Sequence, residues 1–439
     1  MKYDKLFNLA KERGIQDLEL AFSTSKELSF SLFHGEVDSY NNASSASYVI
    51  RGIYNGKLGS VSSDVYSNDL VEYFIDEVIN NAKFIENEDP VFIFGGSEKY
   101  KKINTYNRDL AGIPVDTKMA KLHELEAKLR AGDPRIVEIQ SVGYEESESS
   151  STIINSKGLK LTQKNNYFVF YGVVLAKEGE QMKSGFDLFL DNDFSKLDVD
   201  KLASRIVKET VEQLGGEACE SKNYRAVLSP DVVRNLMGAY IGSAIAEDVQ
   251  KKSSLFVGKL GQKVASSKVT VEDKPLARTI FARWFDDEGV ATYNKAIIKN
   301  GVLQTYLYNL TTAAKENRES TGNGSGAGSK VGTSPWYLEM KPGKLSQEEL
   351  FKEVGNGVYI TDVSGLHAGL NAQSGNFSLQ STGFLIKDGK KDRGLDLITI
   401  SGNLVKLFMD VQLVGNDSKE FIGGKYPSVV VKSIGVSGK

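Results

Sequence analysis

The sequence predicts an α+β fold, with antiparallel sheets and helices in the N-terminal region and a β-rich C-terminal domain that carries one long helix. Apolar residues lie two apart at Leu18, Leu20 and Phe22, which is the period of a strand. Between residues 68 and 84 they lie four apart, as on one face of a helix. Beyond residue 255, short apolar runs alternate with glycine-rich turns, so this part of the chain is expected to be mostly strand.

The chain has 439 residues, which is enough for two or three domains of roughly 150 residues each. We expect an N-terminal α+β unit over 1–85, a central α+β unit over 86–220 and a β-rich domain over 221–439. In the first unit, Asn55-Gly56 separates two strand-like runs and is a strong hairpin signal.

The central unit is expected to begin with an irregular stretch up to residue 112. A helix should start at Pro114, because proline is favoured in the first turn. Short strands are expected after it, near 135–142, 151–155, 159–163, 167–175 and 184–190. A helix near 199–214 should close the unit.

The C-terminal domain opens with a short strand and then Ser229-Pro230, a favourable helix start with serine at the N-cap. This helix is expected to continue through Ile245. One further helix is expected near 346–354, and the Gly/Ser-rich stretch Ser320–Ser329 is expected to be a mobile loop.

Composition predicts a folded, soluble protein, since 40% of the residues are hydrophobic and 25% are charged. The net charge of −3 and the lack of a long Lys/Arg run argue against direct nucleic-acid binding. The single cysteine, Cys219, excludes an intrachain disulfide. The N-terminus does not resemble a signal peptide and no run of about 18 apolar residues occurs, so we expect a cytoplasmic protein without membrane segments.

The residues alone reveal no catalytic group. His123-Glu124 would need a second histidine one helical turn later to hold a metal, and residue 127 is alanine, so a solvated helix face is the favoured interpretation. His34 is expected to lie on the surface, and a lone thiol such as Cys219 is more often inert than nucleophilic. Asp286-Asp287-Glu288 could bind a divalent cation or could equally form a turn of solvated acids.

An ordered series of short motifs changes this picture. They are Phe285–Gly289, Ile298–Val302, Ser320–Asn323, Gly365–Asn371, Ser374–Ser378, Gly383–Ile386, Thr399–Leu404, Val414–Asp417 and Pro427–Val429. The series resembles the signature blocks of the TldD/PmbA family, once called modulators of DNA gyrase, over about residues 250 to 439. The expected layout of 1–220 is compatible with that family.

The resemblance implies one of two kinds of subunit. The TldD kind carries His-Glu-x-x-x-His on the helix of the C-terminal domain, with a cysteine nearer the C-terminus, and these residues hold a catalytic zinc. The TldE or PmbA kind lacks them. The two kinds form a heterodimeric peptidase that acts on unfolded peptides.

The match at Ser254–Gly261 sets the register of the metal-binding block, which falls on Met237–Gly242 when counted back without a gap. Met237 and Gly242 cannot replace the histidines, and Gly238 cannot act as the general base. The resemblance therefore implies a TldE/PmbA-like subunit with no catalytic residue, metal or cofactor of its own. Zinc is expected in a TldD-like partner.

The matching blocks also contain the candidate peptide-binding residues, because exposed strand edges bind extended peptides through main-chain hydrogen bonds. These candidates are His367, Asn371, Ser374, Asn376 and Ser378. Alternatively, the same blocks only build the β-rich domain and a subunit interface. A second function also stays open, a stand-alone homodimeric peptide-binding or scaffold protein without catalysis. In either case the isolated chain is expected to form a homodimer.

Overall fold

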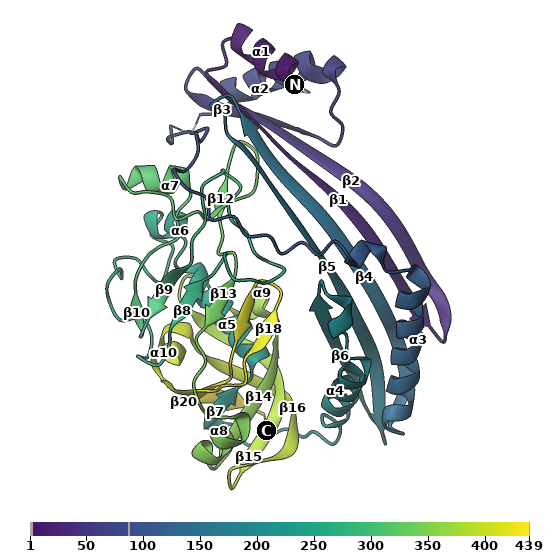
Figure 1. Cartoon of the computed structure of the whole chain (residues 1–439). Helices are drawn as coiled ribbons and strands as arrows, with labels where there is room; N and C mark the ends of the chain where they lie inside the picture. Colours follow the sequence, from purple (N-terminus) through teal and green to yellow (C-terminus); the bar gives the residue numbers. More distant parts are fainter. Residues whose placement is uncertain (1–2, 87, 439) are drawn as a thin grey trace.

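The computed structural model describes residues 3–86 and 88–438 and confirms the α+β class. A long curved sheet from the N-terminal half runs along one side of the molecule, and the C-terminal domain lies against one of its faces (Figure 1). The two ends of the chain lie at opposite ends of the molecule.

All strands of the N-terminal half belong to one antiparallel sheet, in the order β3-β2-β1-β4-β5-β6. The strands are β1 (Asp17–Phe33), β2 (Glu36–Tyr54), β3 (Lys57–Ser63), β4 (Ile136–Asn155), β5 (Lys160–Glu178) and β6 (Gln181–Asp191). The units expected over 1–85 and 86–220 therefore share a sheet, while their boundaries stay a prediction.

The short strands expected near 135–142 and 151–155 were wrong as separate elements, because both are parts of β4. In the same way, 159–163 and 167–175 both belong to β5. The middle of β4 is rich in serine and glutamate and only partly buried, so it lacks the apolar alternation of a strand. Its backbone nevertheless pairs with β1 and β5 without a break there.

The expected hairpin is confirmed. Asn55 and Gly56 both have positive φ, 49° and 74°, and Tyr54 pairs with Lys57. Such a turn matches the twist of the two strands that it connects.

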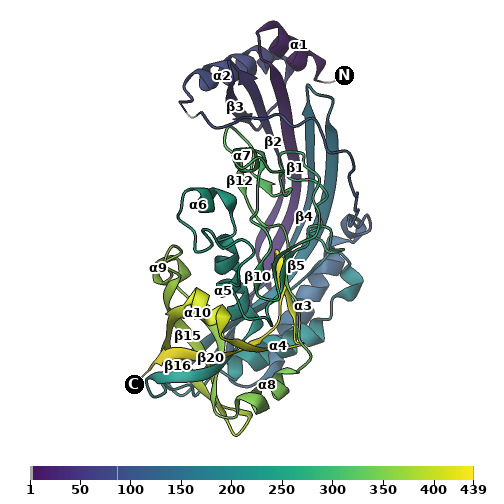
Figure 2. The same ribbon diagram turned by 90° about the vertical axis from the view of Figure 1, so that its left-hand side faces the viewer.

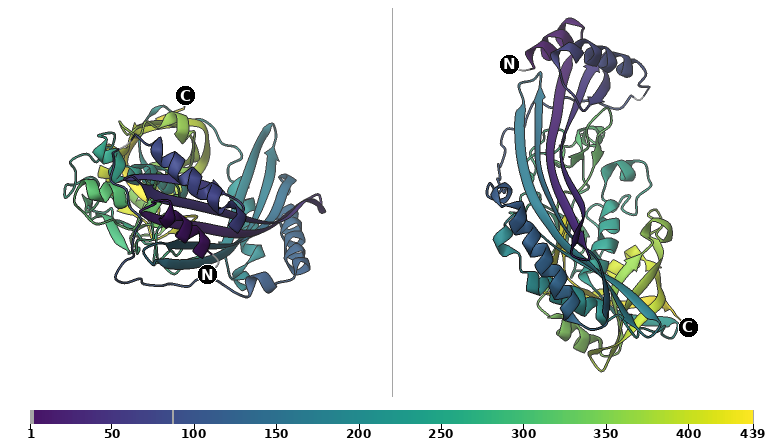
Figure 3. Two further views of the ribbon diagram at one scale, coloured as in Figure 1. Left: turned by 90° about the horizontal axis from the view of Figure 1, so that it is seen from above. Right: turned by 90° about the vertical axis from the view of Figure 1, so that its right-hand side faces the viewer.

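Four helices cover one face of the large sheet. They are α1 (Asp4–Glu12), α2 (Val71–Lys83), α3 (Val115–Gly132) and α4 (Val199–Val211). Leu18 and Leu20 of β1 pack under α1 and α2, while Phe30 and Leu32 pack under α3 and α4. These four side chains are separated by even numbers of residues on one strand, so they share a face. Figure 3 shows α3 running along the outer side of the sheet.

The C-terminal domain packs against the opposite face (Figure 2). Ile153 and Leu161 of the sheet form a small core with Trp284 and Phe285 of that domain. Gln163 strengthens the contact, because its side chain donates to the carbonyl of Ala282 at 2.5 Å and accepts from the backbone N–H of Trp284 at 3.0 Å.

The C-terminal domain is built mainly from two sheets. In the first, β16-β15-β14-β7-β20-β17, β16 also pairs with β20, so five strands close into a barrel. Its strands are β7 (Lys222–Leu228), β14 (Gly357–Ser364), β15 (Asn376–Lys387), β16 (Lys390–Asn403), β17 (Val411–Val414) and β20 (Val429–Ser437). The second sheet has the order β10-β9-β8-β13-β19-β18. Its strands are β8 (Val271–Asp273), β9 (Lys295–Lys299), β10 (Val302–Leu303), β13 (Leu338–Met340), β18 (Lys419–Phe421) and β19 (Gly424–Tyr426).

The expected helix start at Ser229 is confirmed, and α5 (Pro230–Gly242) is the longest described helix of this domain. Helix α5 ends before the expected Ile245, because the backbone of Ala244 and Ala246 bonds to Leu307 instead. The expected helix near 346–354 is α8 (Gln347–Val354). The sequence did not reveal four short helices, α6 (Ala246–Gln250), α7 (Leu310–Lys315), α9 (Leu366–Gly369) and α10 (Leu404–Met409). None of the helices in the described ranges has the length and hydropathy needed to cross a bilayer.

The stretch Ser320–Ser329 differs in part from the mobile loop that its composition predicts. Residues 321–324 are buried, and the side chain of Asn323 donates to Asp273 at 2.8 Å. Gly324–Ser325 forms β11 and pairs with β12 (Gly332–Thr333). Glycine is needed here for close packing, since a Cβ on Gly322 would lie 2.8 Å from the carbonyl oxygen of Ala291.

Candidate functional site

Helix α5 carries the three residues that correspond to the metal-binding block. The side chain of Met237 is fully buried in the core of the C-terminal domain. Gly238 and Gly242 lie four residues apart, hence on one face of the helix, and a Cβ on either would meet no atom within 4 Å. The helix is held by Tyr240, whose hydroxyl donates to the carbonyl of Val264 at 2.6 Å and whose ring packs on Phe256 and Phe408.

These residues do not fit a zinc ion. Structural and catalytic zinc sites use Cys, His, Asp or Glu ligands, and the block offers a buried thioether and two glycines. Within the described ranges, no group of three or more such side chains is arranged to hold a metal.

His34 and His123 lie in the N-terminal half, whereas Cys219 belongs to the same hydrophobic core as Met237 of α5. His34 sits at the β1–β2 turn, largely exposed, with its ring 2.9 Å from Glu138. His123 lies on the exposed face of α3, as expected. Cys219 is a buried free thiol.

The acidic turn Asp286-Asp287-Glu288 is mostly buried. The alternative of solvated acids is wrong for Asp286, which is fully buried, and for Glu288, which is 4% exposed. Asp286 organises the turn by accepting backbone N–H groups of Glu288 at 3.0 Å, Val290 at 2.9 Å and Gly324 at 2.8 Å. The residues that flank this turn in the sequence gave no sign that another part of the chain would cover it.

Burial changes the acidity of both carboxyl groups. Burial raises the pKa of Asp286 to about 7, although three backbone N–H groups act in the opposite direction. The pKa of Glu288 is raised to about 8, mainly by burial and to a smaller extent by repulsion from Asp286. The turn lies near a buried ion pair of the large sheet, in which Arg51 Nε donates to Glu19 at 2.7 Å. The charges of this ion pair act on Glu288 from the large sheet, the Arg51 charge lowering its pKa and the Glu19 charge raising it.

A cleft of about 900 Å³ lies between the two halves; it is hereafter the interdomain cleft. One wall contains β6 and the other contains β18, and each is the edge strand of its sheet. Phe186 of β6 and Ile422, just after β18, are each 59% exposed. Exposed strand edges with apolar side chains are suited to an extended peptide.

Ion pairs fix both walls of this cleft. Arg205 of α4 pairs with Asp187 and also donates to the carbonyl of Leu188. The Arg205 side chain therefore covers part of the β6 edge. On the opposite wall, Lys419 lies 3.1 Å from Asp231. The sequence predicted the β6 strand but gave no signal that residues 418–422 would face it, so the cleft was missed.

The five candidate peptide-binding residues gather at the start of β15, and all five are exposed. Their backbone is partly occupied, since Asn371 N–H donates to the carbonyl of Asn376 at 2.9 Å. Asn371 also accepts the N–H of Ser374 at 2.9 Å, and a Cβ on Gly369 would lie 2.2 Å from the carbonyl oxygen of Ser378. Side chains, rather than a free strand edge, are therefore what this segment presents.

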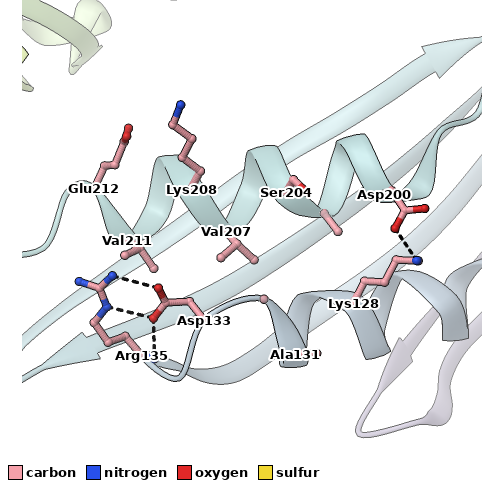
Figure 4. A pocket seen from close by; sticks show the side chains of 12 residues that line it. Lys128, Ala131, Asp133, Arg135, Asp200, Ser204, Val207, Lys208, Val211 and Glu212 are labelled. Carbon is pink, nitrogen blue, oxygen red and sulfur yellow. Dashed lines mark hydrogen bonds and ion pairs between the residues drawn. The ribbon is translucent and has the colours of Figure 1, made fainter.

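A second hollow, of about 560 Å³, lies between α3 and α4 (Figure 4). Its apolar side chains include Val207 and Val211, and ion pairs lie along its sides, Lys128 with Asp200 and Asp133 with Arg135. Among the described residues that line it, every buried polar side chain has a hydrogen-bond partner. We interpret it as the seam between two packed helices.

Three family profiles match the chain in order: PmbA/TldA metallopeptidase domain 1 over residues 18–82, the central domain over 108–214 and the C-terminal domain over 221–438. The chain belongs to the PmbA/TldD family.

Known proteins resemble the chain over most of its length. A candidate modulator of a DNA gyrase from Thermotoga maritima has 32% sequence identity and a TM-score of 0.92, with 99% of each chain covered. The metalloprotease PmbA homologue of Buchnera aphidicola is 28% identical over 87% of this chain and 84% of its own. The TldE structure from Thermococcus kodakarensis, at 22% identity, shares the fold with a TM-score of 0.91 over 100% of both chains.

Proposed function

We propose that this chain is the non-metal, TldE/PmbA-like subunit of a heterodimeric metallopeptidase that processes or degrades unfolded peptides. The observation that carries the proposal is the composition of α5 at the family's metal-binding block. Met237 packs into the core, and Gly238 and Gly242 have no side chain with which to bind a metal or activate water. The helix is retained for packing, and the zinc would come from a TldD-like partner.

The interdomain cleft supports a role in peptide binding. An unfolded peptide has free backbone N–H and C=O groups, and an edge strand such as β6 can pair with them. The exposed apolar side chains at the cleft offer contacts that do not depend on one particular sequence. Such a surface suits a processor of low specificity.

Reconstitution tests the proposal. The purified chain is mixed with a His-Glu-x-x-x-His paralogue from the same organism and an unfolded fluorogenic peptide. We expect cleavage only in the mixture, loss of cleavage with a chelator and recovery with added zinc. If the chain alone, free of contaminating peptidase, cleaved the peptide at a comparable rate, the partner-subunit role would be wrong.

One observation favours the alternative function of a stand-alone peptide-binding protein. The residues that line the interdomain cleft, from both of its walls, belong to this one chain. A genome without a metal-bearing paralogue would favour this alternative. Copurification of such a paralogue from the native cell would exclude it.

A further inference from the structure

Four cationic side chains surround a hollow of about 640 Å³ beside β5. They are Lys102, Arg108, Lys160 and Lys164, and we call this site the basic hollow. The part of the chain that the structure describes contributes no acidic residue to its lining. Among the described residues, none of the four cations forms an ion pair with a carboxylate at 4 Å or less, unlike Lys196, Arg205 and Lys419 of the interdomain cleft.

The local structure explains why these charges gather. Lys160 and Lys164 are exposed on one face of β5, while Leu161 and Gln163 between them turn inward to the C-terminal domain. Strand β6 pairs with β5 only from Phe168 onward, so the edge of β5 is not paired with a strand beside the two lysines.

The loop that carries Lys102 and Arg108 forms the other side of the hollow, and its position is fixed. Asn107 N–H donates to the side chain of Asn166 on β5 at 2.9 Å, and the Asn166 side chain donates to the carbonyl of Asn107 at 2.7 Å. The Asn107 side chain also donates to the carbonyl of Asn192 at 2.6 Å. The four positive charges are therefore held together by the fold.

The aromatic side chains of the hollow are already engaged. Lys102 lies over the ring of Trp284, with its Nζ 5.5 Å from the centroid, and Lys164 lies 6.0 Å over Tyr106. The hydroxyl of Tyr106 donates to Glu148 at 2.9 Å, so the nearby carboxylate has a partner of its own. The hollow thus presents the N–H donors of its lysines and arginine to oxyanions, and cations lie over the aromatic rings on which a nucleic-acid base would stack.

The basic hollow adjoins the interdomain cleft, because Asn104 lines both. We propose that the basic hollow binds the carboxylates of an acidic segment in an extended peptide whose backbone lies along the interdomain cleft. The choice of a peptide as ligand rests on the proposed function, whereas the choice of an anionic segment rests on the four unpaired cations. The chain as a whole has a net charge of −3, so attraction of an acidic peptide must be local.

Binding of labelled peptides to the isolated full-length chain tests this inference. Fluorescence anisotropy compares a peptide that contains a run of Asp and Glu with its Asn/Gln counterpart. We expect tighter binding of the acidic peptide at low salt and a preference that weakens as salt is added. In the double variant Lys160→Gln/Lys164→Gln, the affinity for the acidic peptide should fall roughly tenfold, while the affinity for the neutral peptide should not change.

A matched control is the double variant Lys263→Gln/Lys268→Gln, which removes two exposed lysines of the C-terminal domain. It should bind the acidic peptide like the unaltered chain. Equal affinities of the unaltered chain and the Lys160/Lys164 variant would overturn the inference. A single-stranded oligonucleotide of equal charge that binds at these lysines while the acidic peptide does not would overturn it as well.

The two proposals can fail separately. If the mixture with the paralogue cleaves no peptide, the metallopeptidase role fails, yet charge-dependent peptide binding by the isolated chain remains measurable. If the Lys160/Lys164 variant binds and supports cleavage of acidic peptides as well as the unaltered chain does, only the assignment of the basic hollow fails.

Discussion

At the residue scale, Asp286 and Glu288 show how burial changes the role of an acidic turn. Both carboxyl groups accept backbone N–H groups from segments distant in sequence, Gly324 for Asp286 and Leu310 for Glu288. They therefore tie together three segments of the C-terminal domain. The sequence could reveal the turn but not the burial, because burial depends on the sheet that covers it.

These carboxyl groups predict how stability depends on pH. Their pKa values rise in the folded chain to about 7 for Asp286 and about 8 for Glu288, from ordinary values of 3.8 and 4.5. The folded state therefore binds more protons than the unfolded state between these values, so the stability from both groups falls as pH rises above their ordinary pKa values and is fully lost once pH has passed through about 7 to 8. In Glu288→Gln, the fall in unfolding free energy between about pH 5 and pH 8 should become shallower, by at most about 1.4 kcal/mol per pH unit.

Urea denaturation across this pH range measures the difference between the variant and the unaltered chain. Glu98→Gln, at an exposed glutamate, serves as the matched control and should follow the unaltered chain. A Glu288→Gln profile parallel to that of the unaltered chain would show that Glu288 is ionised when folded throughout the range.

At the element scale, local signals predicted the short-range structure well. Asn55-Gly56 fixed a hairpin, and Ser229-Pro230 fixed the start of α5, where the Ser229 hydroxyl accepts the N–H of Val232 at 3.3 Å. The long strands β4 and β5 were divided in two, because the Ser/Glu-rich middle of β4 and the polar Gln163–Asn166 segment of β5 contribute pairing without apolar alternation. The pairing partner of such a segment lies elsewhere in the chain, so one strand alone cannot reveal it.

Close packing at one glycine and open space at another predict opposite effects of substitution by alanine. A Cβ on Gly59 of β3 would lie 1.9 Å from the carbonyl oxygen of Val78, whereas a Cβ on Gly238 of α5 would meet nothing within 4 Å. Gly59→Ala should therefore destabilise the chain by about 1–3 kcal/mol through overpacking. Gly238→Ala should stabilise it by about 0.5–1 kcal/mol through helix propensity.

Thermal or urea unfolding of both variants measures these changes. A Gly59→Ala chain as stable as the unaltered one would contradict the close contact between β3 and α2. A destabilised Gly238→Ala chain would contradict the open space beside α5.

At the scale of the whole molecule, the sequence motifs identified the family before the arrangement of its parts could be known. The shared N-terminal sheet and the interdomain cleft arise from contacts between residues far apart in the chain, such as Gln163 with Ala282. The positions of Met237, Gly238 and Gly242 were found by counting along the sequence. How these three residues pack could be learned only from the tertiary structure.

Assembly supplies a prediction at this scale. A subunit without catalytic residues acts through an interface or a substrate surface, and related subunits often meet across a two-fold axis. We expect the isolated chain to form a homodimer through its C-terminal domain, burying well above about 2,000 Å² in total. Sedimentation at micromolar concentration measures this, and a clean monomer of 48.1 kDa would contradict it.

The central claim is that the metal of the peptidase belongs to a partner and not to this chain. Elemental analysis by mass spectrometry, after gentle purification without chelators, tests it most directly when applied to the isolated chain and to the reconstituted complex. The account predicts no stoichiometric zinc in the isolated chain and stoichiometric zinc in the complex, with the metal following the His-Glu-x-x-x-His subunit when the two are separated. A tightly held zinc in the isolated chain would contradict the account and would direct attention to the carboxylates of Asp286 and Asp287.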